Sequence, residues 1–229
     1  AGTLITNDKV KVTTSAPQLT TGDLATSLDA LYNYDGEWLR ALVVAKADAT
    51  ILGQLDLFAR RFWPLGKNPE VITNTRPRAA TGETEAQYLT AMAVITGAVQ
   101  SAEVTCATDQ CEMVIQGRRT RRPVSFPYAA RLMAIDDSQD AAAVADGALP
   151  GVYLTTSFDK KNYHDETLSP GLDGLGLTTL RSWRGRPRRP GSYINNPRVL
   201  AGALSDYQFF QLSAIVNRVI EDVHALLES

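Results

Sequence analysis

Short apolar segments rich in β-branched residues alternate with longer segments of helical apolar spacing across residues 38–115. The segments 38–45 (WLRALVVA) and 71–75 (VITNT) have the composition of strands, and the first reads as a buried strand. After each of them, apolar residues recur three or four positions apart, over 51–62 and 85–99. A third strand region follows at 103–115. The order strand, helix, strand, helix, strand predicts an α/β fold in which a mixed sheet carries flanking helices.

Small polar residues mark the expected helix starts. Thr21 or Asp23 is a plausible N-cap for a first helix, and Thr81 or Thr84 for the helix over 85–99. The first helix has one apolar face, formed by Leu24, Leu28 and Leu31. Further along the chain, the sequence predicts a short helix over 127–135 and a turn over 146–151.

The last helix is expected over 205–227, with Ser205 and Asp206 at its start. Its apolar residues fall on one face: Phe209, Leu212, Ile215, Val216, Val219, Ile220, Val223, Leu226 and Leu227. We expect this stripe to pack on the sheet, because burying such a side chain is worth about 1.5–3 kcal/mol. Replacing Ile215 with aspartate is therefore expected to unfold the domain.

Cysteine and histidine are scarce, with Cys106, Cys111, His164 and His224 as the only examples. A disulfide framework is excluded, and the ligand spacing does not fit a four-ligand zinc site, so we expect no metal. The segments 103–106 and 111–115 are interpreted as a β-hairpin in which the two cysteines face each other.

The formal charge is −2, from 23 Lys and Arg against 25 Asp and Glu. This balance excludes a polybasic tail, and no apolar run reaches the ~20 residues of a membrane-spanning helix. Two arginine clusters stand out nevertheless: Arg118, Arg119, Arg121 and Arg122, and Arg184, Arg186, Arg188 and Arg189. They indicate either a partner contact or a solvated loop. We expect no nucleic acid, because the rest of the chain supplies no basic face.

A catalytic or cofactor-binding motif is not found. No Lys-Ser or Lys-Thr pair follows Gly171, Gly174 and Gly176, so the phosphate-binding loop pattern is not met. A dinucleotide-binding pattern needs a strand before the glycines, and Pro170 disfavours one there. The sequence has no Gly-x-Ser-x-Gly elbow. We therefore expect a protein that is not an enzyme, with no cofactor and no catalytic residue. The alternative is a phosphate- or nucleotide-binding α/β enzyme, which would have these glycines at a helix N-terminus lining a pocket.

From Gly117 onward the sequence resembles contractile phage tail sheath proteins of the Mu-like and DUF2586-type families. The stretch GRRTRRPVSFPYAARLMAIDDSQDAAAVADGALPGV is similar to their central region. The stretch LSPGLDGLGLTTLRSWRGRPRRPGSYINNPRVLAGALSDYQFFQLSAIVNRV is similar to their C-terminal core, which has a Gly-rich loop, a strand, an Arg-Pro-Gly loop, a Tyr-Ile-Asn strand and a final helix. Here RPRRPG carries an extra Arg-Arg-Pro. The resemblance covers roughly residues 117–220.

The resemblance implies one sheath-core region over 1–229, with an α/β part at 1–116 and the C-terminal sheath core at 117–229. Such subunits form stacked six-fold rings around an inner tail tube. The rings assemble in the host bacterial cytoplasm as part of the virion tail, and they contract to drive the tube through a bacterial envelope. The implied partners are other sheath subunits, joined by strands exchanged through terminal arms, the tube protein and the baseplate.

The last long helix of these proteins faces the tube, so we expect partner contacts along this helix and in the basic loop. The candidate contacts are Arg184, Arg186, Arg188, Arg189, Gln208, Gln211, Arg218 and Glu221. A general adaptor of an injection machine is a further alternative. Because family sheaths are longer and this sequence begins with Ala-Gly, we also expect a fragment or trimmed form that lacks one or both arms. A sheath without arms is not expected to polymerise.

Overall fold

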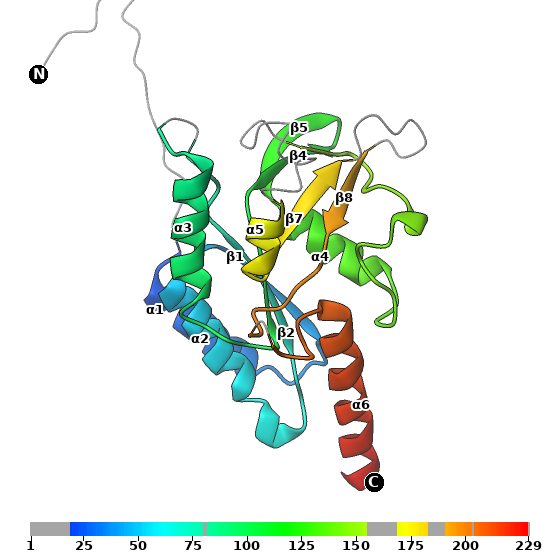
Figure 1. Ribbon diagram of the computed structural model, residues 1–229. Coiled ribbons are helices and arrows are strands. Elements are labelled where there is room, and N and C mark those ends of the chain that lie inside the picture. Colours follow the sequence, from blue (N-terminus) through cyan, green and yellow to red (C-terminus); the bar gives the residue numbers. More distant parts are fainter. Residues whose placement is uncertain (1–18, 80–81, 155–168, 183–190, 203, 229) are drawn as a thin grey trace, which may run out of the picture.

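The computed structural model describes residues 19–79, 82–154, 169–182, 191–202 and 204–228. At its centre lies a five-stranded sheet in the order β1-β2-β3-β7-β8 (Figure 1). The first four strands are parallel to their neighbours, and β8 runs antiparallel to β7. Their bounds are Arg40–Ala47 (β1), Glu70–Thr75 (β2), Val104–Ala107 (β3), Leu177–Ser182 (β7) and Ser192–Asn195 (β8). The predicted α/β fold with a mixed sheet and flanking helices is confirmed.

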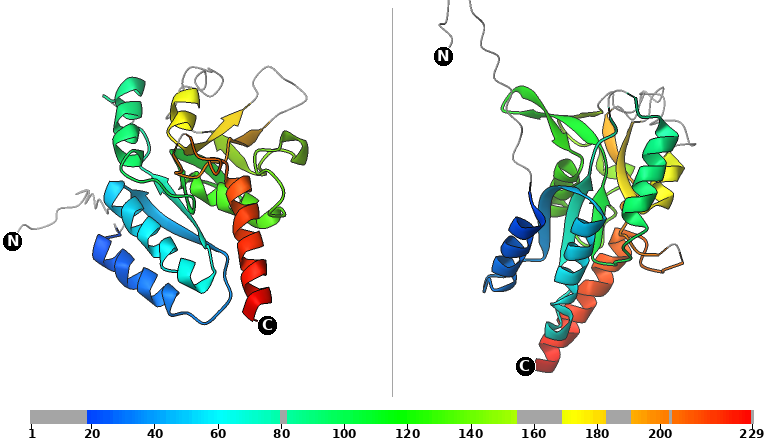
Figure 2. Two further views of the ribbon diagram at one scale, coloured as in Figure 1. Left: turned by 60° about the horizontal axis from the view of Figure 1, so that its bottom comes forward. Right: turned by 90° about the vertical axis from the view of Figure 1, so that its left-hand side faces the viewer.

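Helices cover both faces of the sheet. The crossover helices α2 and α3 lie with α1 on one face, and α4 and α6 lie on the other (Figures 1 and 2). Consecutive parallel strands joined by right-handed crossovers place their helices on the same side, as seen here for α2 and α3. The helices are α1 (Thr21–Tyr32), α2 (Ala49–Arg60), α3 (Glu85–Thr96), α4 (Ser125–Ala134), α5 (Ser169–Gly174) and α6 (Phe210–Glu228), with short 3₁₀ turns η1 (Trp63–Leu65) and η2 (Val144–Asp146).

Side-chain caps fix where the first three helices begin. The α1 helix starts after Thr20, whose side chain forms a capping box with Asp23, so the prediction of Thr21 or Asp23 as N-cap is wrong by one position or more. A second capping box joins Thr84, one of the two predicted caps, to Gln87 at the start of α3. Asp48 caps α2 by accepting a hydrogen bond from the Ile51 amide.

The largest fully buried side chains include Tyr88, Tyr128, Phe58, Leu52 and Leu55, which lie between the helices and the sheet. The prediction of a buried first strand is wrong, because β1 is an edge strand of its sheet. Leu42 and Val44 on β1 are 37% and 56% exposed. Its composition resembles that of a central strand, but the strand order places only β2 beside it.

A second, three-stranded sheet has the order β5-β4-β6, formed by β4 (Gln110–Ile115), β5 (Arg118–Pro123) and β6 (Val152–Leu154), all antiparallel. The predicted hairpin between the two cysteine segments is therefore wrong. Cys106 lies on β3 in the large sheet, and Cys111 lies on β4 in the small one. The actual hairpin joins β4 to β5 through Gln116 and Gly117.

The corner between the sheets explains this difference. Asp109 adopts φ 72°, which turns the chain out of the large sheet. The Thr108 amide donates to the Thr178 carbonyl and holds the end of β3 beside β7. Asn74 is buried at this corner, where its amide donates to the Asp109 carbonyl and accepts from the Ser125 amide at the start of α4. One side chain of β2 thus ties together the corner and a helix start.

Candidate functional site

The α6 helix carries three of the eight partner contacts that the sequence predicted, namely Gln211, Arg218 and Glu221. It begins at Phe210, not at Ser205 as predicted, because Arg198 and Phe209 first form a β-bridge. Ser205 instead accepts a hydrogen bond from the Tyr207 amide in a local turn. From its start, the helix extends away from the body of the molecule (Figures 1 and 2).

The first two turns of α6 pack closely on the body through a buried face made by Phe210, Ser213, Ala214 and Asn217. Phe210 packs edge-on against Tyr128 of α4, with ring centroids 6.1 Å apart. Ser213 donates to the Ala102 carbonyl at 2.8 Å. The anchoring face therefore consists of one aromatic ring and three small or polar side chains.

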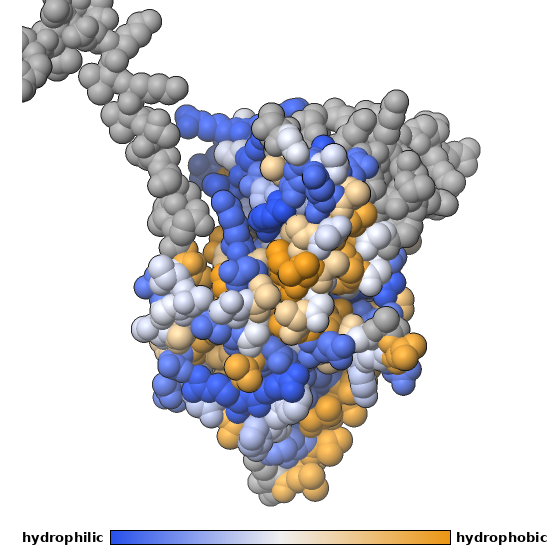
Figure 3. Space-filling model, turned by 60° about the vertical axis from the view of Figure 1, so that its left-hand side comes forward, coloured by the Kyte–Doolittle hydropathy of each residue, from blue (hydrophilic) through white to orange (hydrophobic). Residues whose placement is uncertain are grey.

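The apolar stripe of α6 faces outward, so the prediction that it packs on the sheet is wrong. The exposed fractions are 47% for Leu212, 37% for Ile215, 55% for Val219, 42% for Ile220, 50% for Val223, 75% for Leu226 and 82% for Leu227. Figure 3 shows hydrophobic surface along this lower, projecting part of the molecule. Beyond the first turns, the body residues near α6 are 37–39 and 65–67, which lie on the side of Arg218, Glu221 and His224 and leave the stripe uncovered.

The polar residues expected to contact a partner are engaged within the chain. Gln208 accepts from Arg198 at 2.9 Å, and Gln211 donates to the Ser138 carbonyl. Arg218 lies 3.5 Å from Glu221 in the next turn. Glu221 accepts from the Asn68 amide, while its partial burial raises its pKa. The polar side of α6 thus faces the body.

The four arginines of the basic loop, Arg184, Arg186, Arg188 and Arg189, lie outside the described residues. The other arginine cluster occupies β5, where all four side chains are exposed.

A cleft of about 570 Å³ separates the outer half of α6 from the body. Its body side is formed by residues 37–39 and 65–67, and its helix side includes Arg218, Glu221 and His224. The His224 ring lines the cleft and lies so close to Gly66 that a Cβ on Gly66 would sit 2.2 Å from ring atoms. The outer half of α6 is therefore held by polar contacts and one ring.

A buried ionic cluster lies beneath the root of α6. Arg40, at the start of β1, donates to Glu70 at the start of β2 over 2.6 Å, to the Leu132 carbonyl over 3.0 Å and to Asp137. The same guanidinium lies 5.7 Å from the Phe210 ring centre. The pKa of Glu70 is raised to about 7, because the effect of burial exceeds the lowering effect of Arg40. Sequence reasoning missed this cluster; its only sequence signal is a charge at the first position of two strands.

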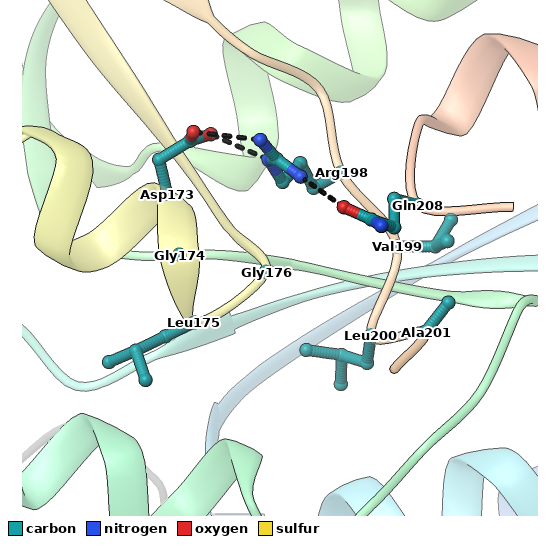
Figure 4. Close-up of a pocket in the computed structure, with 9 residues that line it drawn as sticks. All are labelled: Asp173, Gly174, Leu175, Gly176, Arg198, Val199, Leu200, Ala201 and Gln208. Atoms are coloured by element: carbon teal, nitrogen blue, oxygen red, sulfur yellow. Dashed lines mark hydrogen bonds and ion pairs between the residues drawn. The ribbon is translucent and has the colours of Figure 1, made fainter. Parts of the chain in front are cut away.

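The Gly-rich segment forms α5 and the turn that follows it (Figure 4). Gly174 and Gly176 lie at the C-terminal end of this short helix and line a pocket of about 240 Å³. In this pocket Arg198 makes two hydrogen bonds to Asp173, at 2.7 and 2.9 Å, and a third to Gln208. Helix C-termini present carbonyl groups, which repel anions, and the one guanidinium is already engaged. This end of the pocket does not have the geometry of a phosphate site.

The comparisons with known proteins were negative: no family model and no curated protein matches the chain. Within the described residues, no group of three or more potential metal ligands occurs, and no helix has the length and apolar character needed to cross a membrane.

Proposed function

We propose that this chain is a structural subunit of a contractile tail sheath, which surrounds an inner tail tube and contracts to drive it through a bacterial envelope. In this proposal it assembles in the host bacterial cytoplasm and becomes part of the virion tail. Its partners are other sheath subunits, the tube protein and the baseplate, and it has no catalytic role.

The observation that carries the proposal is the outward apolar stripe of α6. Seven large apolar side chains on one projecting helix are far more than the scattered apolar residues of an ordinary surface, and such patches mark contact sites. In the sheath proteins that the sequence resembles, the last long helix faces the tube. The tube contact proposed for α6 is apolar, through residues such as Val219 and Val223, because Gln211 and the preceding Gln208 are engaged within the chain.

The fold is compatible with a polymer of heterologous contacts. The β4–β5 hairpin and the C-terminal end of α6 lie at opposite ends of the molecule (Figure 1). When two different surfaces of successive copies meet, the contacts form a ring if the rotation between copies closes and an open helical array if it does not.

Electron microscopy of the full-length protein, coexpressed with its inner tube protein, tests the proposal. We expect regular tubes with six-fold rings from the unchanged chain. We expect the double variant Val219→Asp, Val223→Asp to remain folded but to lose the tube-filled assemblies. The matched control is Met133→Asp on α4, which is also exposed, at 76%, and should assemble normally.

Two outcomes would contradict the proposal. The first is the absence of any ordered tube from the unchanged full-length chain. The second is binding of inorganic phosphate, ATP or GTP in calorimetry, lost when Arg198 is replaced with alanine, because this would favour the alternative of a phosphate- or nucleotide-binding enzyme.

A further inference from the structure

The β5 strand carries a dense cluster of exposed arginines. Four of its six residues are arginines, and all four are exposed. Arg119 lies 4.0 Å from Glu112 and over the Tyr153 ring at 4.6 Å. Among the residues that the structure describes, the other three guanidinium groups have no ion pair.

The strand is also an open sheet edge. It lies at one end of the order β5-β4-β6, so no described strand pairs with its outer side. Long exposed edges invite pairing with another chain. The hairpin lies at one end of the molecule, opposite the tip of α6 (Figures 1 and 2).

The register identifies which backbone groups point outward. Gln116 and Gly117 form a two-residue turn with φ 50° and 75°, so the closing pair of Ile115 and Arg118 is hydrogen-bonded across the hairpin. Hydrogen-bonded and non-hydrogen-bonded pairs then alternate. Arg119 and Arg121 belong to the second kind, and their N–H and C=O groups face the open edge.

The same two residues present their side chains on one face of the small sheet. Their partners across β4 are Val114 and Glu112, and Glu112 in turn lies opposite Tyr153 on β6. Val114 and Tyr153 are 41% and 44% exposed, so this face combines arginine, tyrosine and valine with the single glutamate Glu112. Arginine and tyrosine are enriched where proteins contact one another.

We infer that the outer edge of β5 binds an extended acidic segment of a partner protein, which adds to the small sheet as a further strand. Backbone hydrogen bonds to Arg119 and Arg121 would hold the strand, and carboxylates at alternate positions would pair with their guanidinium groups. This inference concerns the chemistry of the partner and stands whether or not the chain is a sheath subunit.

A protein strand fits this edge better than nucleic acid does. The arginines alternate between the two faces of β5, so each face carries only two of them, whereas a nucleic-acid platform combines a basic groove with several aromatic rings that are free to stack on bases. The single tyrosine on the outer face already lies under Arg119. The spacing of the outward backbone groups matches a strand, and the chain as a whole is slightly acidic.

Calorimetry with short synthetic probes tests the inference on the unchanged protein. A capped peptide that alternates glutamate with threonine is expected to bind, more weakly as salt is added. A matched peptide of the same sequence with every backbone amide N-methylated carries the same charge but has no N–H group to donate to the edge. We expect it to bind about tenfold more weakly or worse. Equal binding of the two peptides, no binding of either, or tighter binding of single-stranded DNA would overturn the inference.

Matched variants locate the site. Arg121→Gln and Lys46→Gln each remove one exposed charge from an edge strand, on β5 and β1 respectively. Only Arg121→Gln should weaken peptide binding, and the double variant Arg119→Gln, Arg121→Gln should weaken it about tenfold or more. Equal effects of Arg121→Gln and Lys46→Gln would place binding elsewhere. Thermal unfolding of each variant confirms that it is folded. Peptide binding without tube formation would leave this inference intact while contradicting the sheath proposal.

Discussion

Glu70 is a carboxylate that the fold buries almost completely, with a side chain 4% exposed. It faces Arg40 from its own sheet, Asp137 from the segment after α4 and the more distant Glu221 from α6. Removal from water disfavours its charged form more strongly than Arg40 favours it, and the pKa rises from 4.5 to about 7.

This raised pKa predicts how stability depends on pH. Between pH 4.5 and 7 the folded state holds a proton on Glu70 that the unfolded chain has released. The contribution of Glu70 to the free energy of unfolding is therefore fully present below pH 4.5 and is lost as the pH rises through 7. The full shift corresponds to about 3 kcal/mol. We expect Glu70→Gln to flatten the dependence of the unfolding free energy on pH over this window. A slope unchanged by the substitution would contradict the assignment.

Gly66 is a second position where one residue fixes local structure. Its φ of 66° is unfavourable for other residues, and the His224 ring occupies the space of a side chain. We expect Gly66→Ala to destabilise the protein by about 1–2 kcal/mol from backbone strain alone, plus the cost of moving the ring. In a His224→Ala background only the backbone cost should remain. Additive effects in denaturant unfolding would show that the ring does not rest on Gly66.

At the scale of elements, α6 departs most from its sequence pattern. A helix with one apolar stripe normally turns that stripe toward the core. Here the anchoring face is Phe210, Ser213, Ala214 and Asn217, and the stripe faces outward. The exposed stripe accounts for the projecting shape of the helix and for its proposed role in contacts.

The exposed stripe reverses the expectation from sequence that Ile215→Asp unfolds the domain. Because Ile215 is 37% exposed, Ile215→Asp should lower the unfolding free energy by about 1 kcal/mol or less. Phe210→Asp, which puts a charge at a 4% exposed site beside Tyr128, should cost about 3 kcal/mol or more. Urea titrations of the two variants provide the comparison. Similar losses for both would mean that the stripe is buried in solution.

At the scale of the whole molecule, the two cysteines lie in two different sheets and can be used to follow the unfolding of each sheet. Cys106 belongs to the large sheet and Cys111 to the small one, and both thiols are free and buried. Burial raises the pKa of each thiol to about 12, so neither is a thiolate near neutral pH.

Thiol labelling therefore tests whether the chain unfolds as one domain. The variants Cys106→Ser and Cys111→Ser each retain one thiol, and the test measures how fast that thiol reacts with a thiol reagent at pH 8. Both thiols should react slowly, at rates set by global unfolding and equal within the difference in stability of the two variants. Much faster labelling of Cys111 would show that the small sheet opens separately.

Local patterns in the sequence were sufficient to predict several elements of the large sheet and its flanking helices. Composition, spacing and neighbours within a few residues were enough to predict four features. These are the strand at 71–75, the helices over 51–62 and 127–135, and the Thr84 cap of α3. The polar residues Thr73 and Asn74 inside β2 were compatible with a strand, but their partners were not predictable from it.

Long-range contacts decided the rest. The separation of the two cysteines depends on Thr178, Asn74 and Ser125, which meet Thr108 and Asp109 only after the sheet has formed. The Arg40–Glu70 pair exists because two parallel strands are in register at their first residues. Whether the apolar stripe of α6 is covered depends on where the body ends, and a helical pattern gives the stripe but not the surface that it faces. The sequence by itself determined most of the helices and the β2 strand, because these depend on local spacing and composition. Only the tertiary structure determined how the other strands pair and which faces of the elements remain open to a partner, because both depend on contacts between residues far apart in the chain.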